Sequence, residues 1–511
     1  MRIRASLLVP VILLFSQAEL FGKGHWSPSN LSEPAPGVEF SVSIADGLLQ
    51  TPFTGRVVVY LSTMRSEPRF GPNWFNPQPA FSQKFKNIGP NEPMVIGQDA
   101  IGGVPGSMRD LKAGEYTVQA VVDLNLGGRS IGESPGNLYS VPKRAYIDPL
   151  SDSVIKIECT KVVADKLFKD TPAAKAARMQ SKLLSAFYGR PANMRAAVIL
   201  PESYDKETSR KYPVVYSIPG FGGSFLDYSG TTQREGTSRD GVEFIEVVLD
   251  PNCPTGHCVF ADSANNGPWG KALVTEFIPY IEKTFRAVRK PEGRFTRGHS
   301  SGGWSSLWLQ VAYPDFFGGC WSTSPDPVDF RDFQRIDLYK QGQNMFKDEN
   351  GKPRPLARFG DTPAIFYQQF SDMERPIRGE QLGSFEAVFS PRGEDGEPMK
   401  LWDRTTGAVD NAVALAWQKY DIGLILRKNW KVLGPKLTGK IHVYMGNMDT
   451  FYLDGAVRLL QKDLKDLGSD AVVEMLPGDH ATVMTHELEQ RIDREMAAKW
   501  RAFKGELALL P

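Results

Sequence analysis

The sequence shows almost no excess of charge of either sign. Its 511 residues include 60 Lys and Arg against 59 Asp and Glu, so the formal net charge is +1. Proteins that bind nucleic acid or an anionic membrane surface usually carry a broad basic field, which this balance does not provide. The sequence therefore argues against nucleic acid as a partner.

Cysteine is also scarce, with four residues in the whole chain. Cys253 and Cys258 are close enough in sequence to close a small disulfide loop in an oxidising compartment. A zinc site is a weaker interpretation: His257 lies between them, but no second Cys or His pair follows at ligand spacing. We interpret Cys159 and Cys320 as small buried apolar residues and predict neither a metal nor a cofactor.

Long hydrophobic runs are absent after the first residues. Arg2 and Arg4 precede an apolar run over residues 5–15, and the small-residue pattern Ser-Gln-Ala follows at 16–18. This is the layout of a signal peptide, and the run is shorter than the roughly 20 residues that a membrane-spanning helix needs. We predict a signal peptide over residues 1–18, a periplasmic or secreted protein, and no membrane span in the mature chain.

The first of two predicted domains is a β-sandwich over residues 30–164. It has short alternating or β-branched runs between loops rich in Pro, Gly and Asn, and no helical periodicity of useful length. The runs are VEFSVSIA at 38–45, RVVVYLS at 56–62, EYTVQAVVDL at 115–124 and SVIKIECTKVV at 153–163. The pattern is typical of a β-sandwich but does not indicate what this domain does.

A charged, mostly helix-permissive segment, residues 165–190, is predicted to connect this domain to a second one over residues 191–511, or to lead into that second domain. In the second domain, strand-like runs alternate with helix-like ones. The strand-like runs lie at 195–201, 212–220, 243–250, 294–300, 318–323, 440–445 and 471–476, and the helix-like ones at 271–285, 301–312, 454–467 and 483–503. This alternation predicts a mostly parallel sheet with helices on both faces. Residues 327–433 interrupt it, and we predict that this insertion forms a cap over the site.

The sequence GHSSG at 298–302 has the pattern of a nucleophile elbow, with Ser300 as the nucleophile. Such a serine lies on a sharp turn between a strand and a helix, and the flanking glycines let the two backbones approach closely. The motif alone is a weak signal in a chain with 48 glycines. Here strand-like RFTR precedes it and helix-like GGWSSLWLQVAY follows it. In this context the pattern predicts the α/β-hydrolase fold.

A serine hydroxyl needs an imidazole to take its proton and a carboxylate to orient that imidazole. In this fold the chain order is serine, acid, histidine. His480 follows a predicted strand in the loop PGDH, whereas its main rival, His486, falls within the last predicted helix. We therefore assign His480 as the base.

Asp449 is our candidate for the acid, because it follows the predicted strand KIHVYM at the edge where the loops of a parallel sheet converge. Two alternatives stay open. Asp454 has the position of a helix N-terminal residue, and Asp479 is adjacent to His480 and so cannot easily face it.

A glycine-rich loop, PGFGG at 219–223, follows an early predicted strand. In acyl transfer, the oxyanion is held by the backbone N–H after the nucleophile and by one from such a loop. We predict the amides of Phe221 and Ser301 for this role. Trp269 and Trp304 are weak candidates for stacking on a substrate, since core packing explains a tryptophan equally well.

At this point the second domain resembles the putative esterase family, which includes esterase D, enterochelin esterase, feruloyl esterase domains and mycolyltransferases. The resemblance rests on YPVVYSIPGFGG, NNGPWGKALVTEFIPYIEKTF, FTRGHSSGGWSSLWLQVAYPDFFGG, GNMDTFYLDGA and PGDHATV, which occur in the family's order over about 212–486. It implies Ser300, Asp449 and His480 as the triad, with Phe221 and Ser301 at the oxyanion positions. Two features depart from the family: Pro219 stands where many relatives have His, and the insertion is long.

The prediction is a serine carboxylic-ester hydrolase that acts through an acyl-enzyme on a small-molecule or carbohydrate ester, feruloyl-type esters included, without a cofactor. An acyltransferase or a serine peptidase of the same fold would use the same residues. An alternative of another class is a glycan-binding protein whose hydrolase domain is degenerate, although the full set of catalytic residues argues against it. The acyl group, the alcohol and the oligomeric state cannot be inferred from the sequence.

Overall fold

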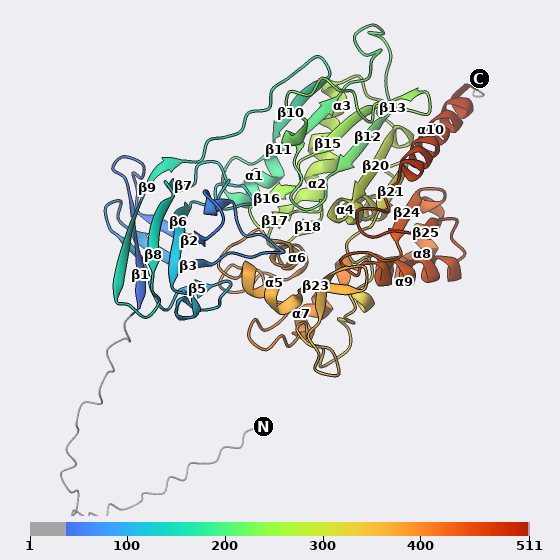
Figure 1. The fold of residues 1–511 in the computed structure, drawn as a ribbon. Helices are drawn as coiled ribbons and strands as arrows, with labels where there is room; N and C mark the ends of the chain where they lie inside the picture. The colour runs from blue at the N-terminus through green and yellow to red at the C-terminus, as the bar shows by residue number, and fades with distance from the viewer. Residues whose placement is uncertain (1–36, 509–511) are drawn as a thin grey trace, which may run out of the picture. The chain divides into compact units, whose positions relative to one another are not determined.

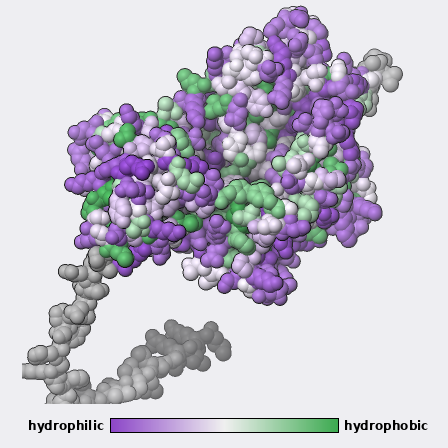
Figure 2. Space-filling model, in the orientation of Figure 1, coloured by the Kyte–Doolittle hydropathy of each residue, from purple (hydrophilic) through white to green (hydrophobic). Residues whose placement is uncertain are grey.

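The computed structural model describes residues 37–508 (Figure 1). The predicted signal peptide, residues 1–18, lies outside the described residues, as does the start of the predicted N-terminal domain up to residue 36. The described residues belong to one compact unit. None of their helices is long and apolar enough to cross a membrane. On the face shown in Figure 2, hydrophilic residues cover most of the surface, and hydrophobic ones form small patches between them.

The N-terminal strands form one hydrogen-bonded sheet in the order β4-β1-β9-β7-β6-β2-β3-β5, with β8 also pairing with β6. Their bounds are β1 Val38–Ile44, β2 Phe53–Ser62, β3 Ala80–Ile88, β4 Met94–Ile96, β5 Ile101–Gly102, β6 Gly114–Asp123, β7 Leu138–Ser140, β8 Lys143–Ile147 and β9 Ser153–Val162; two 3-10 helices are η1 Pro68–Phe70 and η2 Met108–Asp110. β1 and β9 run parallel, and the other pairs are antiparallel. Alternate residues of β1 are buried in a core that this sheet builds for itself.

The second sheet has eight strands in the order β10-β11-β15-β12-β20-β21-β24-β25. The bounds are β10 Ala174–Gln180, β11 Asn193–Ile199, β12 Val214–Ile218, β15 Ile245–Leu249, β20 Arg294–His299, β21 Gly319–Thr323, β24 Ile441–Gly446 and β25 Val472–Leu476. All pairs from β15 to β25 are parallel, and the two pairs formed by β11 are antiparallel. The predicted mostly parallel sheet is therefore present.

Helices pack on both faces of this sheet, as the burial of β12 shows. Val214 and Tyr216 belong to one core with the helical segment over residues 269–284, whereas Val215 belongs to another core with the C-terminal helix. Alternate residues of a strand point to opposite faces, so the two cores lie on opposite sides. The helices outside the insertion are α1 Lys182–Tyr188, α2 Trp269–Ala272, α3 Ile278–Thr284, α4 Ser301–Ala312, α9 Asp454–Asp466 and α10 His486–Ala508; a π-helical segment, η4 Leu273–Phe277, joins α2 to α3, and η3 Phe225–Tyr228 and η5 Pro291–Gly293 are 3-10 helices.

The segment predicted as a connector, residues 165–190, contains β10 and α1. Its composition is permissive for helix, yet residues 174–180 form an edge strand that pairs residue by residue with β11. Residues 174–180 form a strand and not a helix because the free edge of β11 offers backbone hydrogen-bond partners, which outweigh a weak local preference for helix.

The predicted insertion lies between β21 and β24 (yellow to orange in Figure 1). It contains η6 Phe330–Asp332, β22 Pro355–Phe359, β23 Thr362–Phe366, α5 Tyr367–Glu374, α6 Gln381–Phe389, α7 Asn411–Ala416, η7 Trp417–Tyr420 and α8 Ile422–Leu437. Its aromatic side chains share one core with α4 and β24, and Trp417 contacts Phe330, Phe333 and Phe389. The insertion is thus packed onto the sheet through a hydrophobic core.

Three short hairpins, each made of two strands of two residues, complete the fold: β13 Ser238–Arg239 with β14 Val242–Glu243, β16 Asn252–Cys253 with β17 Gly256–His257, and β18 Asp262–Ser263 with β19 Gly267–Pro268.

The disulfide that the sequence allowed between Cys253 and Cys258 is not formed, and both are buried free thiols. The Cys253 thiol instead lies 3.4 Å from the Thr255 hydroxyl. Cys159 and Cys320 are also buried and free, as expected of small apolar residues.

We expect Trp417→Ala to lower the free energy of unfolding by about 3–5 kcal/mol, because it leaves a cavity in a core that the insertion shares with the sheet. Trp417 is fully buried. Leu415→Ala, in the adjacent helix α7, is the matched control, since Leu415 is 55% exposed. Denaturant unfolding measures both. Equal stability of the two variants would mean that the insertion is not part of the cooperative core.

Candidate active site

Ser300 lies on a strained turn between β20 and α4, with φ 60° and ψ −125°. A left-handed conformation of this kind is rare for a residue other than glycine and is typical of functional sites. The neighbouring glycines permit it: a Cβ on Gly298 would lie 2.2 Å from the carbonyl oxygen of Gly302, and one on Gly302 would lie 1.9 Å from that of Ile218. The turn predicted from GHSSG is therefore present, and its glycines are required by close backbone contacts.

His480 and Asp449 are in direct contact. The Nδ1–H of His480 donates to Oδ2 of Asp449 over 2.6 Å. The other carboxylate oxygen, Oδ1, accepts the backbone N–H groups of Phe451, at 2.8 Å, and Leu453, at 3.3 Å. Since a carboxylate only accepts, the imidazole carries its proton on Nδ1 and leaves Nε2 available as a base.

The pKa of His480 is raised above its ordinary value of 6.5. Burial lowers this pKa, but the hydrogen bond that His480 donates to Asp449 and the negative charges of Asp449 and Asp326 outweigh burial. The neighbouring His299 behaves in the opposite way. Burial and the charge of His480 lower its pKa to about 4, so His299 stays neutral at physiological pH.

The rival residues have other partners. His486 begins α10, where its Nε2 lies 2.9 Å from Nε2 of Gln490. Asp454 begins α9 and pairs with Arg358 and Arg458, both at 3.4 Å. The carboxylate of Asp479 accepts N–H groups in its own turn, including that of Thr482 at 2.8 Å. Of these candidates, the structure brings only Asp449 and His480 together.

The loop after β12 approaches Ser300 closely. A Cβ on Gly220 would lie 3.4 Å from Cβ of Ser300, and Phe221 lines the same cavity as Ser300. Ser301 is the first residue of α4. Amides in the first turn of a helix have no intrahelical acceptor and favour a negative charge. Both predicted oxyanion residues therefore lie next to Ser300.

A buried histidine that the sequence did not single out for this role, His257, anchors the same loop. Its Nδ1 accepts the backbone N–H of Val259 at 3.0 Å, so Nε2 carries the proton and donates to the carbonyl oxygen of Pro219 over 2.9 Å. Burial lowers the pKa of His257 to about 4, which keeps it neutral. Pro219 stands where many relatives have His, and here an imidazole reaches the loop from another segment.

A cavity of about 280 Å³ is lined by Ser300 and His480, whereas Asp449 is fully buried and does not line it. The cavity lining comes from the hydrolase sheet, the insertion and the N-terminal domain, and is mostly aromatic or aliphatic. The lining residues are Trp74, Gly220, Phe221, His299, Ser300, Asp326, Gln334, Leu356, Phe370, Gln381, Leu382, Phe385, Phe451, Leu453 and His480.

Asp326 is a cavity residue that sequence reasoning missed. It follows the predicted strand β21 by three residues, which was the available signal, since loops at this edge of a parallel sheet converge on the site. Its carboxyl accepts the Ser301 hydroxyl over 2.5 Å and lies 3.4 Å from Nε2 of Gln381. Burial raises the pKa of Asp326 to about 6, against the effects of the Ser301 hydrogen bond and the nearby His480.

The two tryptophans proposed as substrate contacts do not line this cavity, which corrects that expectation. Trp269 is buried against Phe260. Trp304 is buried on α4, where it stacks on Trp308. Both are core residues. Trp269 begins α2 and Trp304 lies in α4, and each side chain is buried in a hydrophobic core. The tryptophan that does line the cavity, Trp74, carried no sequence signal, because it lies in an irregular loop of the other domain.

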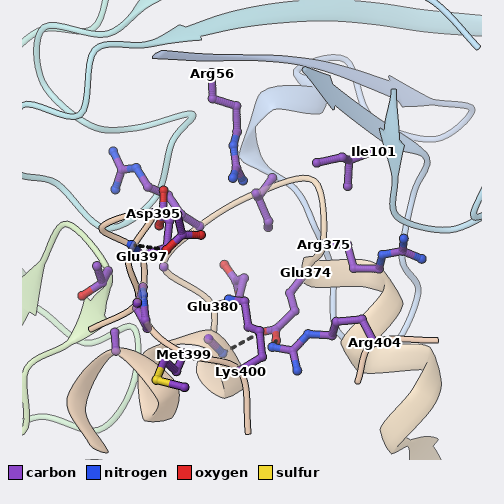
Figure 3. Close-up of a pocket in the computed structure, with 18 of the residues that line it drawn as sticks. Arg56, Ile101, Glu374, Arg375, Glu380, Asp395, Glu397, Met399, Lys400 and Arg404 are labelled. Carbon is purple, nitrogen blue, oxygen red and sulfur yellow. Dashed lines mark hydrogen bonds and ion pairs between the residues drawn. The ribbon is translucent and has the colours of Figure 1, made fainter. Parts of the chain in front are cut away.

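A larger cavity, about 1170 Å³, lies between the N-terminal domain and the insertion (Figure 3). Its lining is rich in charges of both signs, most of them paired: Lys84 with Glu397 at 2.9 Å, Arg404 with Glu386 at 2.6 Å and Arg378 with Asp123 at 2.6 Å. None of its lining residues also lines the cavity at Ser300. Across residues 37–508, no cluster of three or more His, Cys, Asp or Glu side chains could hold a metal ion.

An eight-stranded, mostly parallel sheet with a serine held on a strained turn between a strand and a helix defines an α/β-hydrolase. The family model described as "Putative esterase" matches residues 190–452, just over half of the chain, and the protein belongs to this family. The match includes Ser300 and Asp449. The resemblance inferred from the sequence motifs is confirmed.

Two curated relatives match over the same length. Esterase MT1326 of Mycobacterium tuberculosis (strain CDC 1551 / Oshkosh) and Esterase Rv1288 of Mycobacterium tuberculosis (strain ATCC 25618 / H37Rv) are each 24% identical over 268 residues, which is 52% of this chain. The chain spans 56% of the length of each relative.

Solved structures are similar at low identity. A ferulic acid esterase is 15% identical with a TM-score of 0.39, and the match covers 65% of this chain and 100% of that one. An S-formylglutathione hydrolase from Agrobacterium tumefaciens is 14% identical with a TM-score of 0.37, covering 64% of this chain and 94% of that one. At these scores the likenesses say nothing about substrate.

We expect Asp449→Asn to lower the pKa of His480, because the neutral amide removes the carboxylate charge that opposes burial and leaves only the smaller effects of Asp326 and Asp479. Titration of the imidazole ¹³C signals of selectively labelled protein measures this, with His480→Ala to assign the signal. Asp479→Asn is the matched control, because Asp479 contributes least among the residues that raise the pKa of His480. The pKa of His480 should fall less in this variant than in Asp449→Asn. An unchanged pKa in Asp449→Asn would contradict the contact.

Proposed function

We propose that the protein is a serine carboxylic-ester hydrolase that works through an acyl-enzyme. The observation that carries this proposal is the contact between His480 and Asp449 at 2.6 Å, together with the fact that His480 lines the same cavity as Ser300. A base already oriented by a carboxylate beside a serine on a strained turn is the arrangement that activates a hydroxyl for attack on an acyl carbon.

In the first half of the reaction, Nε2 of His480 takes the proton from the Ser300 hydroxyl as the oxygen attacks the ester carbonyl carbon. The tetrahedral intermediate collapses, the ester C–O bond breaks, and His480 gives the proton to the departing alcohol. In the second half, a water molecule attacks the acyl carbon while Nε2 of His480 takes its proton. The bond from the acyl carbon to Ser300 Oγ breaks, His480 returns the proton to that oxygen, and the carboxylic acid leaves. Asp449 keeps the imidazole in the tautomer that both halves require.

The negative charge that develops on the carbonyl oxygen needs hydrogen-bond donors. We assign this role to the backbone N–H groups of Phe221 and Ser301, which flank Ser300. Donors fixed in advance stabilise the charge as it forms, and removal of one such donor typically lowers kcat about 100- to 1000-fold. The bond from His257 to Pro219 supports this assignment by holding one side of the loop in place.

We propose that the substrates are esters with an apolar or aromatic acyl group, feruloyl-type esters among them, and the lining of the cavity supports this. Five aromatic residues face it, namely Trp74, Phe221, Phe370, Phe385 and Phe451. Its polar groups are few, which suits a pocket that binds by burial and uses one or two hydrogen bonds for orientation. The alcohol is a small molecule or a carbohydrate in this proposal.

We further propose that the insertion acts as a cap and that the N-terminal strands fold as a β-sandwich beside it. The cap is supported by Leu356, Phe370 and Phe385, insertion residues that wall the cavity. The sandwich is supported by the alternating burial in β1 and by a core separate from that of the hydrolase sheet.

We propose that the protein is exported, on the basis of the basic, apolar and small-residue pattern over residues 1–18. Expression in a Gram-negative host followed by N-terminal sequencing of the periplasmic fraction tests this. The mature chain should begin at residue 19. Recovery of the intact N-terminus in the cytoplasm alone would contradict export.

We expect the wild-type protein to react with a fluorophosphonate probe and to hydrolyse short-chain aryl esters, and Ser300→Ala to do neither. His480→Ala should lower kcat by about 1000-fold or more, because the serine loses its base. His486→Ala is the matched control, an exposed histidine six residues further on, and should retain wild-type turnover. Intrinsic fluorescence and thermal melting establish that each variant is folded.

The outcomes separate the alternatives. If the probe labels Ser300 but esters are consumed only when an alcohol or amine acceptor is supplied, the protein is an acyltransferase. Cleavage of peptides in place of esters would make it a peptidase. A folded wild-type protein that neither labels nor hydrolyses any ester overturns the catalytic proposal and leaves glycan binding as the function to test.

A further inference from the structure

One residue of the N-terminal domain, Trp74, reaches into the cavity at Ser300. It lies between η1 and β3, far from the hydrolase domain in sequence. Its ring centroid is 5.7 Å from that of Phe221, 5.0 Å from that of Phe370 and 6.3 Å from that of Phe451. These separations are those of aromatic packing contacts, so Trp74 joins the oxyanion loop, the insertion and the loop that carries Asp449.

A second residue of the N-terminal domain, Arg129, contacts the same phenylalanine. Its guanidinium carbon lies 4.7 Å from the ring centroid of Phe221, a cation–π distance, and the guanidinium also donates to the carbonyl oxygen of Gly379 over 3.1 Å. Phe221 therefore has two contacts from the N-terminal domain, one aromatic and one cationic.

Glu380 links these two residues. Its Oε2 accepts the indole N–H of Trp74 at 2.9 Å, and its Oε1 accepts from Arg129 at 3.4 Å. Glu380 is 9% exposed and precedes Gln381, which begins α6 and lines the cavity at Ser300. Figure 3 shows Glu380 on the wall of the larger cavity. A buried carboxylate with two donors fixes both of them, because a lost partner would leave a buried charge under-satisfied.

We infer that the N-terminal domain is part of the active site: Trp74 is a specificity-determining wall of the acyl pocket, and Arg129 is a positioning residue that holds Phe221 for oxyanion binding. This inference rests on the proposed function. It assigns a role to a domain that lies outside the residues matched by the family. The domain shapes the pocket through Trp74 and holds the loop at Phe221 through Arg129. Glu380 accepts hydrogen bonds from both side chains and so fixes their relative positions.

The two roles predict different kinetic effects. Trp74→Ala enlarges the pocket and removes contact area that only a bulky acyl group uses, so KM for a 4-nitrophenyl benzoate should rise about tenfold while KM for the acetate stays within about twofold. Arg129→Ala loosens Phe221, whose amide acts only on the developing charge, so kcat should fall about tenfold for both esters with KM unchanged. A merely structural role would not separate the effects in this way.

Conservative variants and a matched control complete the experiment. Trp74→Phe keeps a ring in the pocket and should restore KM for the benzoate to within about threefold of wild type. Arg129→Lys keeps a cation over Phe221 and should recover part of kcat. Phe75→Ala is the control, because Phe75 lies in the same loop, is 49% exposed and stacks on Phe359. It should behave as wild type with both esters.

Kinetics on the full chain with these two esters, together with fluorophosphonate labelling of each variant, tests the inference. If the wild type labels and hydrolyses esters but Trp74→Ala and Arg129→Ala have wild-type constants, or if both change all constants equally for both esters, the inference fails and the proposed function stands. If the wild type is inactive and unlabelled, the proposed function fails and the inference with it. If Trp74→Ala does not fold, an unchanged acetate-to-benzoate ratio in Trp74→Leu would equally overturn the role of Trp74.

Discussion

The close approach of three backbone segments around Ser300 is the constraint on which the rest of the site depends. The end of β12, the end of β20 and the first turn of α4 meet where Gly298 and Gly302 have no side chain, and a Cβ on Gly302 would lie 1.9 Å from the carbonyl oxygen of Ile218. The same contact brings the loop after β12 next to Ser300. One steric requirement therefore places the serine and a predicted oxyanion donor together, and their relative position tolerates no added atom.

Burial sets the protonation states in this region, and specific partners modify them. His257, His299 and His480 are all largely buried, and burial alone lowers the pKa of each. Only His480 has a carboxylate in direct contact, and only its pKa is raised. The hydrogen bond to Asp449 and the nearby carboxylate charges thus distinguish His480 from the two neutral histidines.

The sequence predicted those features that repeat along the chain or occupy one short segment. Alternating or β-branched runs located β1, β2, β6 and β9, and the pattern GHSSG located the turn at Ser300. The sequence-based predictions failed where contacts between distant segments determine the structure. Strand β10 forms because β11 offers a free edge, and Trp74 faces the cavity because elements far apart in sequence pack together. No local pattern carries such information, which also explains why Trp269 and Trp304 could not be distinguished from pocket residues.

Buried charge links the N-terminal domain to the hydrolase domain. Arg378, in the insertion, forms two hydrogen bonds to Asp123 at the end of β6, at 2.6 and 2.7 Å, and Asp123 is 3% exposed. The pKa of Asp123 is lowered: burial alone would raise it, and the hydrogen bond and charge of Arg378 outweigh that effect. Separation of the N-terminal sheet from the insertion would leave this carboxylate without Arg378, so the pair favours one relative orientation of the two over others. That orientation is the one in which Trp74 reaches Phe221, and a domain outside the matched family residues can thereby shape the cavity at Ser300.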